Sequence, residues 1–158
     1  MSQAQQDVFH QLEANDNTLK FTTLRKEILS ILLESKKAMS AYDVLAILKK
    51  SRESAEAMTV YRVIEYLIEK NIIHRISTEN KYVFCTQIKH GSCEHSGLFF
   101  ICKKCLSSFE VLDKNFDALL KNLSRKHQFF TDASFVEIKG VCKDCMPKHH
   151  ILAASTPD

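Results

Sequence analysis

The sequence predicts an α+β chain of two modules: a helical N-terminal module that ends in a β-hairpin, and a smaller, cysteine-bearing α/β module. Three observations support this prediction. Four segments within the first 70 residues carry apolar side chains at helical spacing, and after Asn71 the spacing changes to every second residue. The third observation is a set of four cysteines in two Cys-x-x-Cys pairs, Cys102 with Cys105 and Cys142 with Cys145.

The helical module begins with a weak amphipathic segment and continues with three helices that each present one apolar stripe. The predicted helices are Gln5–Ala14, a second that follows the cap candidates Thr22 and Thr23, a third that opens with the capping-box sequence Ser40-Ala-Tyr-Asp43, and a fourth over about Met58–Lys70. Three core-facing helices in a row predict a small bundle.

Two short strands follow the bundle. Residues 72–77 and 81–86 alternate in the manner of strands and are separated by Thr78-Glu79-Asn80. A hairpin after a helix bundle is the winged helix-turn-helix arrangement, in which the fourth helix of this chain would enter the major groove of DNA.

The C-terminal module is predicted to be a small α/β domain. We expect domain boundaries at 1–86 for the winged helix, 87–92 for a polar hinge, 93–150 for the second domain and 151–158 for a tail. The predicted elements of the second domain are strands at Leu98–Cys102, Ser107–Leu112 and about Ser134–Lys139, with a helix at about Asn115–Lys126. A module of fewer than about 70 residues builds a limited core, so a metal and a partner subunit are expected to support it.

The two Cys-x-x-Cys pairs predict one structural zinc ion, because tetrahedral zinc takes four thiolates at about 2.3 Å from two such turns. A redox pair would instead need one Cys-x-x-Cys at the start of a helix. Disulfides are the remaining interpretation. The first residues lack a secretory signal and no segment reaches the roughly 18 apolar residues of a membrane span, so we expect a cytoplasmic protein with reduced thiols.

His74 and Cys85 form a second candidate metal pair. If the hairpin pairs Ser77 with Tyr82, His74 lies directly opposite Cys85, with Cβ atoms roughly 4.5 to 5.5 Å apart. An imidazole and a thiolate at that distance can share one cation. A half-buried His and Cys without a metal is the alternative interpretation.

Two further ligands, His95 and Glu110, are available beyond the hinge. A site made of these residues with His74 and Cys85 would span both modules and fix their orientation, as a sensor requires. One thiolate and two imidazoles favour zinc over manganese or magnesium, and four protein ligands leave no open position for catalysis. We interpret Cys93 as a non-ligand. We interpret His90 and His127 as hinge and surface residues, and His149-His150 as a solvated tail or an adventitious metal binder.

Charge alone barely favours a nucleic-acid partner, since the net charge is +3 and residues 1–88 carry 12 Lys and Arg against 11 Asp and Glu. Position along the helices is more informative. Tyr42 starts the third helix and Arg62 lies early in the fourth, where side chains of a recognition helix reach base edges. Tyr61 either packs in the bundle or touches the DNA backbone. Candidate phosphate contacts, each of which could equally be a solvated charge, are Lys20, Arg25, Lys26 and Lys81.

Several segments together resemble the ferric uptake regulator family over about Leu19 to Cys145. They are Ser40-Ala-Tyr-Asp43, Thr59-Val-Tyr-Arg62, Tyr82-Val-Phe-Cys85, Phe100-Ile-Cys-Lys-Lys-Cys105 and Gly140-Val-Cys-Lys-Asp-Cys145. The chain is most similar to the zinc-responsive branch, because His74-Arg-Ile and Tyr82-Val-Phe-Cys85 match its ligand pair. The resemblance implies a dimeric, zinc-dependent repressor with a winged-helix domain and an α/β dimerisation domain.

Carried over by residue, the resemblance implies two zinc ions per chain. The structural ligands fall on Cys102, Cys105, Cys142 and Cys145, the regulatory ligands on His74, Cys85, His95 and Glu110, and the DNA contacts on Tyr42 and Arg62. Two positions depart from the family. Thr23 replaces a frequent proline at the start of the second helix, and Leu106 replaces a glycine just after the first cysteine pair, so that turn is expected to differ.

The function predicted from the sequence is a zinc-responsive repressor that binds palindromic operator DNA as a homodimer. An iron- or peroxide-responsive regulator of the same family is the close alternative, although the segment Gly97-Leu-Phe-Phe-Ile replaces the histidine-rich run of those branches. A zinc hydrolase would need a three-ligand site with an open position, and no His-Glu-x-x-His motif occurs, so we do not expect an enzyme. A structural zinc-ribbon adaptor is a further alternative.

Overall fold

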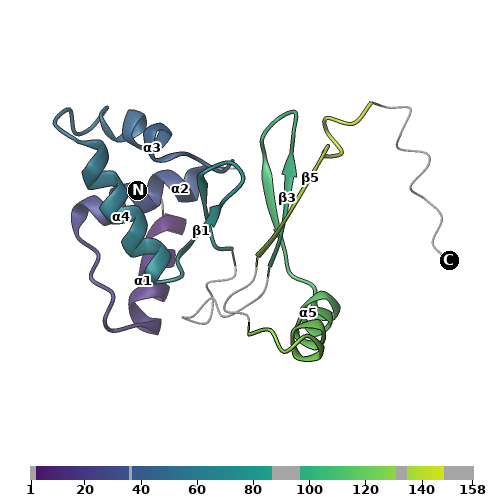
Figure 1. The fold of residues 1–158 in the computed structure, drawn as a ribbon. Coiled ribbons are helices and arrows are strands. Elements are labelled where there is room, and N and C mark those ends of the chain that lie inside the picture. Colours follow the sequence, from purple (N-terminus) through teal and green to yellow (C-terminus); the bar gives the residue numbers. More distant parts are fainter. Residues whose placement is uncertain (1–2, 36, 87–96, 131–134, 148–158) are drawn as a thin grey trace. The chain divides into compact units, whose positions relative to one another are not determined.

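The computed structural model describes residues 3–35, 37–86, 97–130 and 135–147, and the chain divides into two compact units, residues 1–94 and 95–158. The predicted hinge at 87–92 and tail at 151–158 lie outside the described residues. Figure 1 shows four helices and a hairpin in the first unit, and a small sheet with one helix in the second.

The first unit is a winged helix-turn-helix, as predicted. Its elements are α1 (Gln3–Asn15), α2 (Thr23–Glu34), α3 (Ala41–Leu48), α4 (Ala57–Glu69), β1 (Ile73–Ile76) and β2 (Lys81–Phe84). One apolar core joins these elements, with fully buried side chains that include Ile28, Leu29, Val44, Val60 and Leu67. Each of these residues lies on the apolar stripe of its helix, so the predicted helical periodicity accounts for the core. No helix among the described residues is long and apolar enough to span a bilayer.

Local signals fix where α3 begins and where α4 ends. Ser40 and Asp43 form the predicted capping box: the Asp43 N–H donates to Ser40 Oγ at 3.1 Å, and the Ser40 N–H donates to Asp43 Oδ2 at 2.8 Å. These bonds to Ser40, first through its hydroxyl and then through its backbone, hold the pKa of Asp43 below its usual value of 3.8. The chain leaves α4 through Asn71, which takes a φ of 53°.

Asn71 ends α4 in a Schellman motif. The Ile72 N–H donates to the Leu67 carbonyl at 2.9 Å, and the Asn71 N–H donates to the Ile68 carbonyl at 2.8 Å. Asparagine tolerates this left-handed conformation, and Ile72 and Leu67 are both buried beside the turn. The motif passes the chain from α4 directly into β1.

The hairpin register differs from the prediction. Ile76 pairs with Lys81 and His74 pairs with Val83, so His74 does not lie directly opposite Cys85. The turn begins one residue earlier than expected, at Ser77, because Asn80 takes the left-handed conformation (φ 50°) that closes it. Moving the turn by one residue moves each cross-strand partner by two, and a two-residue shift keeps every side chain on its face. His74 and Cys85 therefore remain diagonal neighbours on one face of the hairpin.

A bridge ties this hairpin to the helices. The Met39 N–H donates to the Tyr82 carbonyl at 2.9 Å, and the Tyr82 N–H donates to the Met39 carbonyl at 2.7 Å. Because Met39 directly precedes the cap of α3, this pair of hydrogen bonds anchors β2 to the helix-turn-helix.

The second unit is a three-stranded sheet with one helix. Its elements are β3 (Gly97–Cys102), β4 (Ser108–Val111), α5 (Lys114–Lys126) and β5 (Phe135–Gly140), and the strand order is β4-β3-β5. β3 pairs antiparallel with β4 and parallel with β5. All four elements agree with the predicted α/β organisation to within one residue at most ends. Asp113 caps α5 by accepting from the Phe116 N–H at 2.8 Å.

Few side chains are buried within this unit. Among its described residues, the buried apolar ones are Phe99, Ile101 and Cys102. α5 buries none of its residues and lies beyond one end of the sheet in Figure 1. Large apolar side chains remain exposed on the sheet, on α5 and after it, namely Phe100, Phe109, Val111, Leu112, Leu119, Leu123, Phe129, Phe130, Val136, Ile138 and Val141. A surface of this kind indicates an interface.

Replacement of Ser40 by Ala should destabilise the first unit by about 1 kcal/mol, since it removes the hydroxyl half of the capping box. The loss should be full at neutral pH and should shrink as the pH falls below 3.8, because a protonated Asp43 no longer gains from the box. Urea unfolding followed by helical circular dichroism at several pH values measures this. Ser54→Ala, at an exposed position in a loop, is the matched control and should change the free energy of unfolding by less than about 0.5 kcal/mol. Equal effects of the two substitutions would contradict the prediction.

Candidate metal centre

The parallel pairing of β3 and β5 brings the two Cys-x-x-Cys turns together. Cys102, the last residue of β3, lies opposite Gly140, the last residue of β5, and the Lys103 N–H donates to the Gly140 carbonyl at 2.8 Å. Each turn therefore starts at the same edge of the sheet. Cys142 and Cys145 follow β5 closely, so segments 36 residues apart meet in space, as the sequence predicted.

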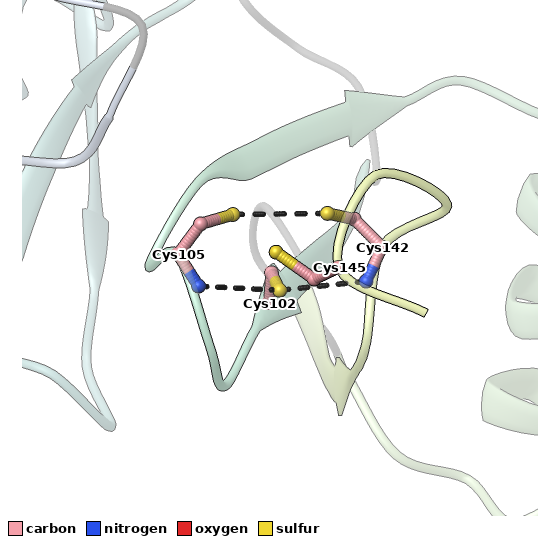
Figure 2. A group of neighbouring side chains, drawn as sticks. All are labelled: Cys102, Cys105, Cys142 and Cys145. Carbon is pink, nitrogen blue, oxygen red and sulfur yellow. Dashed lines mark hydrogen bonds between the residues drawn. The ribbon is translucent and has the colours of Figure 1, made fainter. Parts of the chain in front are cut away.

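The four sulfur atoms have the spacing of a tetrahedral site. Figure 2 shows the side chains of the four cysteines turned toward a common centre, and all four Sγ atoms lie within 4.8 Å of one another. The Sγ atoms of Cys105 and Cys142 are 3.7 Å apart. Ligands at about 2.3 Å from a tetrahedral zinc ion lie about 3.8 Å from each other. No disulfide joins these cysteines, so the donor set fits zinc.

Hydrogen bonds to sulfur orient the ligands. Cys102 Sγ accepts from the Cys142 N–H at 3.4 Å and from the Cys105 N–H at 3.5 Å, which links the two turns through one sulfur (Figure 2). Lys104 links them a second time by donating from Nζ to the Cys145 carbonyl at 3.2 Å. Such outer contacts fix the position of metal ligands before the metal arrives.

The crowded thiols differ in acidity. The Cys142 and Cys105 N–H groups lower the pKa of Cys102 to about 6, so this sulfur is a thiolate at neutral pH. Its neighbours have the opposite effect on Cys145, whose pKa rises to about 12, first through the hydrogen bond with Cys142 and then through that with Cys105. Four thiolates cannot share so small a space without a compensating cation. A divalent ion would remove this conflict.

The turn after the first cysteine pair has a left-handed conformation, which glycine favours. Leu106 has a φ of 60°, and its N–H donates to the Cys102 carbonyl at 2.9 Å. Because Leu106 stands where the family often has glycine, this leucine is held in a conformation that glycine adopts without strain. The cost of such a conformation is about 1–2 kcal/mol.

His74 and Cys85 form a two-ligand group inside the first unit. A ring nitrogen of His74 and the Sγ atom of Cys85 lie within 4.8 Å of each other, and both residues are buried. The diagonal placement described above produces this proximity, where the sequence analysis expected direct opposition. Glu110 is half-buried on β4 of the second unit, opposite Phe99. His95, Cys93, His90 and the His149-His150 pair lie outside the described residues, and His127 is exposed at the end of α5.

Of the predicted DNA contacts, Tyr42 lies on α3, Tyr61 and Arg62 lie on α4, and Lys20 lies just before α2. Tyr42 is 65% exposed and packs edge-on against Tyr61, with ring centroids 6.3 Å apart. Tyr61 is itself half-buried against the core, so it supports Tyr42 from within the bundle. Arg62 is exposed on α4.

The basic residues near α2 have different surroundings. Lys20 is exposed, and its backbone N–H donates to the Tyr66 hydroxyl at 3.1 Å. Arg25 is engaged within the protein: its guanidinium stacks on the Tyr66 ring at 3.5 Å and donates to the Lys20 carbonyl at 2.6 Å. Lys26 pairs with Glu13 at 3.4 Å. Lys81 on β2 lies 4.0 Å from Glu79.

The sequence analysis did not single out one exposed residue of α4. Met58, in the first turn of α4, is 63% exposed. An apolar residue on the polar side of an otherwise amphipathic helix was the available signal.

Comparisons with known proteins show which family this chain is similar to. The model of the ferric uptake regulator family matches residues 16–139. The chain is 28% identical to the zinc uptake regulation protein of Escherichia coli (strain K12) over 128 residues, which cover 81% of this chain and 74% of that protein. It is 27% identical to the zinc uptake regulation protein of Mycobacterium tuberculosis (strain ATCC 25618 / H37Rv), over 78% of this chain and 93% of that protein. A solved structure of a zinc uptake regulator complexed with zinc and DNA has a TM-score of 0.82 and 27% identity, and the match covers 91% of this chain and 96% of that one.

Replacement of Leu106 by Gly should stabilise the second unit by about 0.5–1 kcal/mol, because the relief of left-handed strain exceeds the added entropy of the unfolded chain. Urea unfolding of the zinc-loaded protein measures the change. Leu112→Gly is the matched control: Leu112 has similar exposure but no positive φ, so this change should destabilise. A loss of stability in both variants would show that Leu106 is not strained.

Proposed function

The chain belongs to the ferric uptake regulator family, and from this premise we propose that it is a zinc-responsive transcriptional repressor. It binds palindromic operator DNA as a homodimer when a regulatory zinc site is filled, and so controls genes for zinc uptake. The observation that carries the proposal is the buried pair of His74 and Cys85 in a winged-helix unit. Both residues belong to the hairpin segment that follows α4. The zinc- and DNA-bound structural relative supports the same assignment.

Two zinc ions per chain are proposed, with different roles. Cys102, Cys105, Cys142 and Cys145 would hold a structural ion, since four thiolates close the coordination sphere and the unit around them has little core of its own. His74 and Cys85 would hold a regulatory ion together with His95 and Glu110. Zinc suits this mixed set of one thiolate, two imidazoles and one carboxylate, and four protein ligands leave no place for a substrate.

The regulatory ion would act by joining ligands from two units. His74 and Cys85 belong to the first unit, whereas Glu110 belongs to the second. Zinc would then favour whichever arrangement of the units brings all four ligands to bonding distance. Its differential affinity for that arrangement supplies the free energy of the switch, typically 1–3 kcal/mol for a coupling of this kind.

The connection from His74 to the DNA-binding surface is short. The Schellman motif at Asn71 passes α4 directly into β1, and His74 is the second residue of β1. Both Leu67 and Ile73 beside this junction are buried, so α4 and β1 form one packed body. An ion that joins His74 to ligands of the second unit would therefore also fix the direction of α4 relative to that unit.

α4 is the proposed recognition helix. Its exposed Arg62 can donate two hydrogen bonds to guanine O6 and N7 in the major groove. Tyr42, braced by Tyr61, lies on the neighbouring α3, and the exposed Lys20 is the proposed phosphate contact.

Dimerisation is proposed to occur through the second unit. Apolar side chains on its sheet and on α5 are left exposed in the single chain, and α5 buries none of its residues there. A second copy would cover such a surface symmetrically and would present two α4 helices to a palindrome.

An iron- or peroxide-responsive regulator, the alternative that the sequence left open, is less well supported. A thiolate such as that of Cys85 is a soft ligand that favours zinc, and the zinc uptake regulators named above match most of this chain.

Replacement of Arg62 by Ala should weaken operator binding by about 5- to 150-fold per half-site, the value of one bidentate base contact, and should leave folding and zinc content unchanged. Fluorescence anisotropy with labelled duplexes measures the affinity. Arg52→Ala is the matched control, because Arg52 is engaged with Glu27 at 2.7 and 3.1 Å. If the Arg62 variant bound the operator with unchanged affinity, α4 would be ruled out as the recognition helix.

Replacement of His74 by Ala should lower the zinc content from two ions per chain to one. Operator affinity in zinc buffer should fall by roughly 5- to 150-fold, toward that of the wild type after mild chelation. Atomic emission measures the metal, and anisotropy in buffered zinc measures the DNA affinity. His10→Ala, an exposed histidine on α1, should retain both properties. A variant at His74 that keeps two ions, or keeps its zinc response, would refute the regulatory site.

A further inference from the structure

Met58 is an exposed apolar side chain on α4, the proposed recognition helix. It is the second residue of α4, is 63% exposed, and belongs neither to the buried core of the first unit nor to the half-buried shell around it. Its exposure therefore has no explanation in the packing of the single chain. An apolar side chain in this position gains free energy only when something covers it.

Helical spacing places Met58 beside Arg62. The two residues are four positions apart, so they lie on the same face of α4 and Met58 precedes Arg62 by one turn. The opposite face of α4 is buried through Val60, Val63 and Ile64. Met58 and Arg62 thus form one exposed strip on the N-terminal half of the helix, the half that contacts base edges in helix-turn-helix proteins.

We infer that Met58 is a specificity-determining residue that contacts the 5-methyl group of a thymine in each operator half-site. This inference rests on the proposed function and deepens it. The thymine methyl is the apolar group that base edges present in the major groove, and apolar side chains recognise it by contact. Methionine suits this role because its flexible, polarisable thioether adapts to the surface it meets.

The helix geometry also places the thymine relative to the guanine read by Arg62. Four residues of α-helix rise about 6 Å, and successive base pairs are about 3.4 Å apart. The contacted thymine should therefore lie within about two base pairs of that guanine. Thymine at this position would be preferred over the three other bases, because none of them carries a methyl group there.

The test uses the zinc-loaded full chain and a duplex that it selects from a random library. Each thymine of the selected duplex is replaced in turn by deoxyuridine, symmetrically in the two half-sites, which removes only the methyl group. Dissociation constants are measured by anisotropy for the wild type, Met58→Ala and Met58→Leu. Ile47→Ala, at an exposed apolar position on α3, is the matched control.

One thymine position should respond in the wild type. Loss of its methyl should weaken binding about fourfold per half-site, the value of one buried methyl group. Met58→Ala should bind the original duplex more weakly by a similar factor and should no longer distinguish thymine from deoxyuridine at that position. Met58→Leu and Ile47→Ala should retain the distinction.

Three results would overturn the inference. They are an operator affinity of Met58→Ala equal to that of the wild type, a methyl effect that persists unchanged in this variant, and a selected operator with no thymine near the contacted guanine. If the zinc-loaded wild type selects no sequence at all, the proposed function fails as well. A selected operator without a Met58-dependent methyl effect leaves that function intact and removes only the role of Met58.

Discussion

The parallel pairing of β3 with β5 is the constraint on which the second unit depends. It sets Cys102 beside Gly140 and so starts both cysteine turns from one edge of the sheet. Few of the side chains that the structure describes in this unit are buried, so its strands receive little stabilisation from packing. Coordination of the proposed structural zinc ion by four thiolates would take the place of a larger core, as in other small metal-dependent domains. The hydrogen bonds to Cys102 Sγ and the link from Lys104 organise the ligands for that role.

The first unit is organised in the opposite way, with a continuous apolar core and its functional residues on the surface or at the edge of that core. Asn71 joins the two elements on which the proposed regulation depends. The helix that carries Arg62 and the strand that carries His74 meet at one short Schellman motif, with buried side chains on each side of it. Packing of this kind transmits an orientation well, because a well-packed body moves as a whole.

Most of the fold could be predicted from the sequence because its signals are local. Helical stripes, the capping box at Ser40 and the alternation after Asn71 each act within a few residues, and the elements begin and end close to the expected positions. The hairpin register could not be predicted, since it depends on which residue of the turn adopts a positive φ, and Asn80 does so. The proximity of His74 and Cys85 was still predicted correctly, because the error of two residues preserved the strand face. Met58 was missed because its place off the apolar stripe of α4 indicates exposure but no role, and single exposed apolar residues are common on protein surfaces.

The order of the cysteines along the chain has a consequence for biosynthesis. Cys102 and Cys105 leave the ribosome well before Cys142 and Cys145, and β5 can pair with β3 only after the intervening helix has been made. A chain that stops before Cys142 has half of the thiolates and an unfinished sheet. Such a fragment cannot complete the four-cysteine group, and it leaves exposed the edge of β3 that would pair with β5. The four-cysteine group can therefore be completed only in a chain that extends through Cys145.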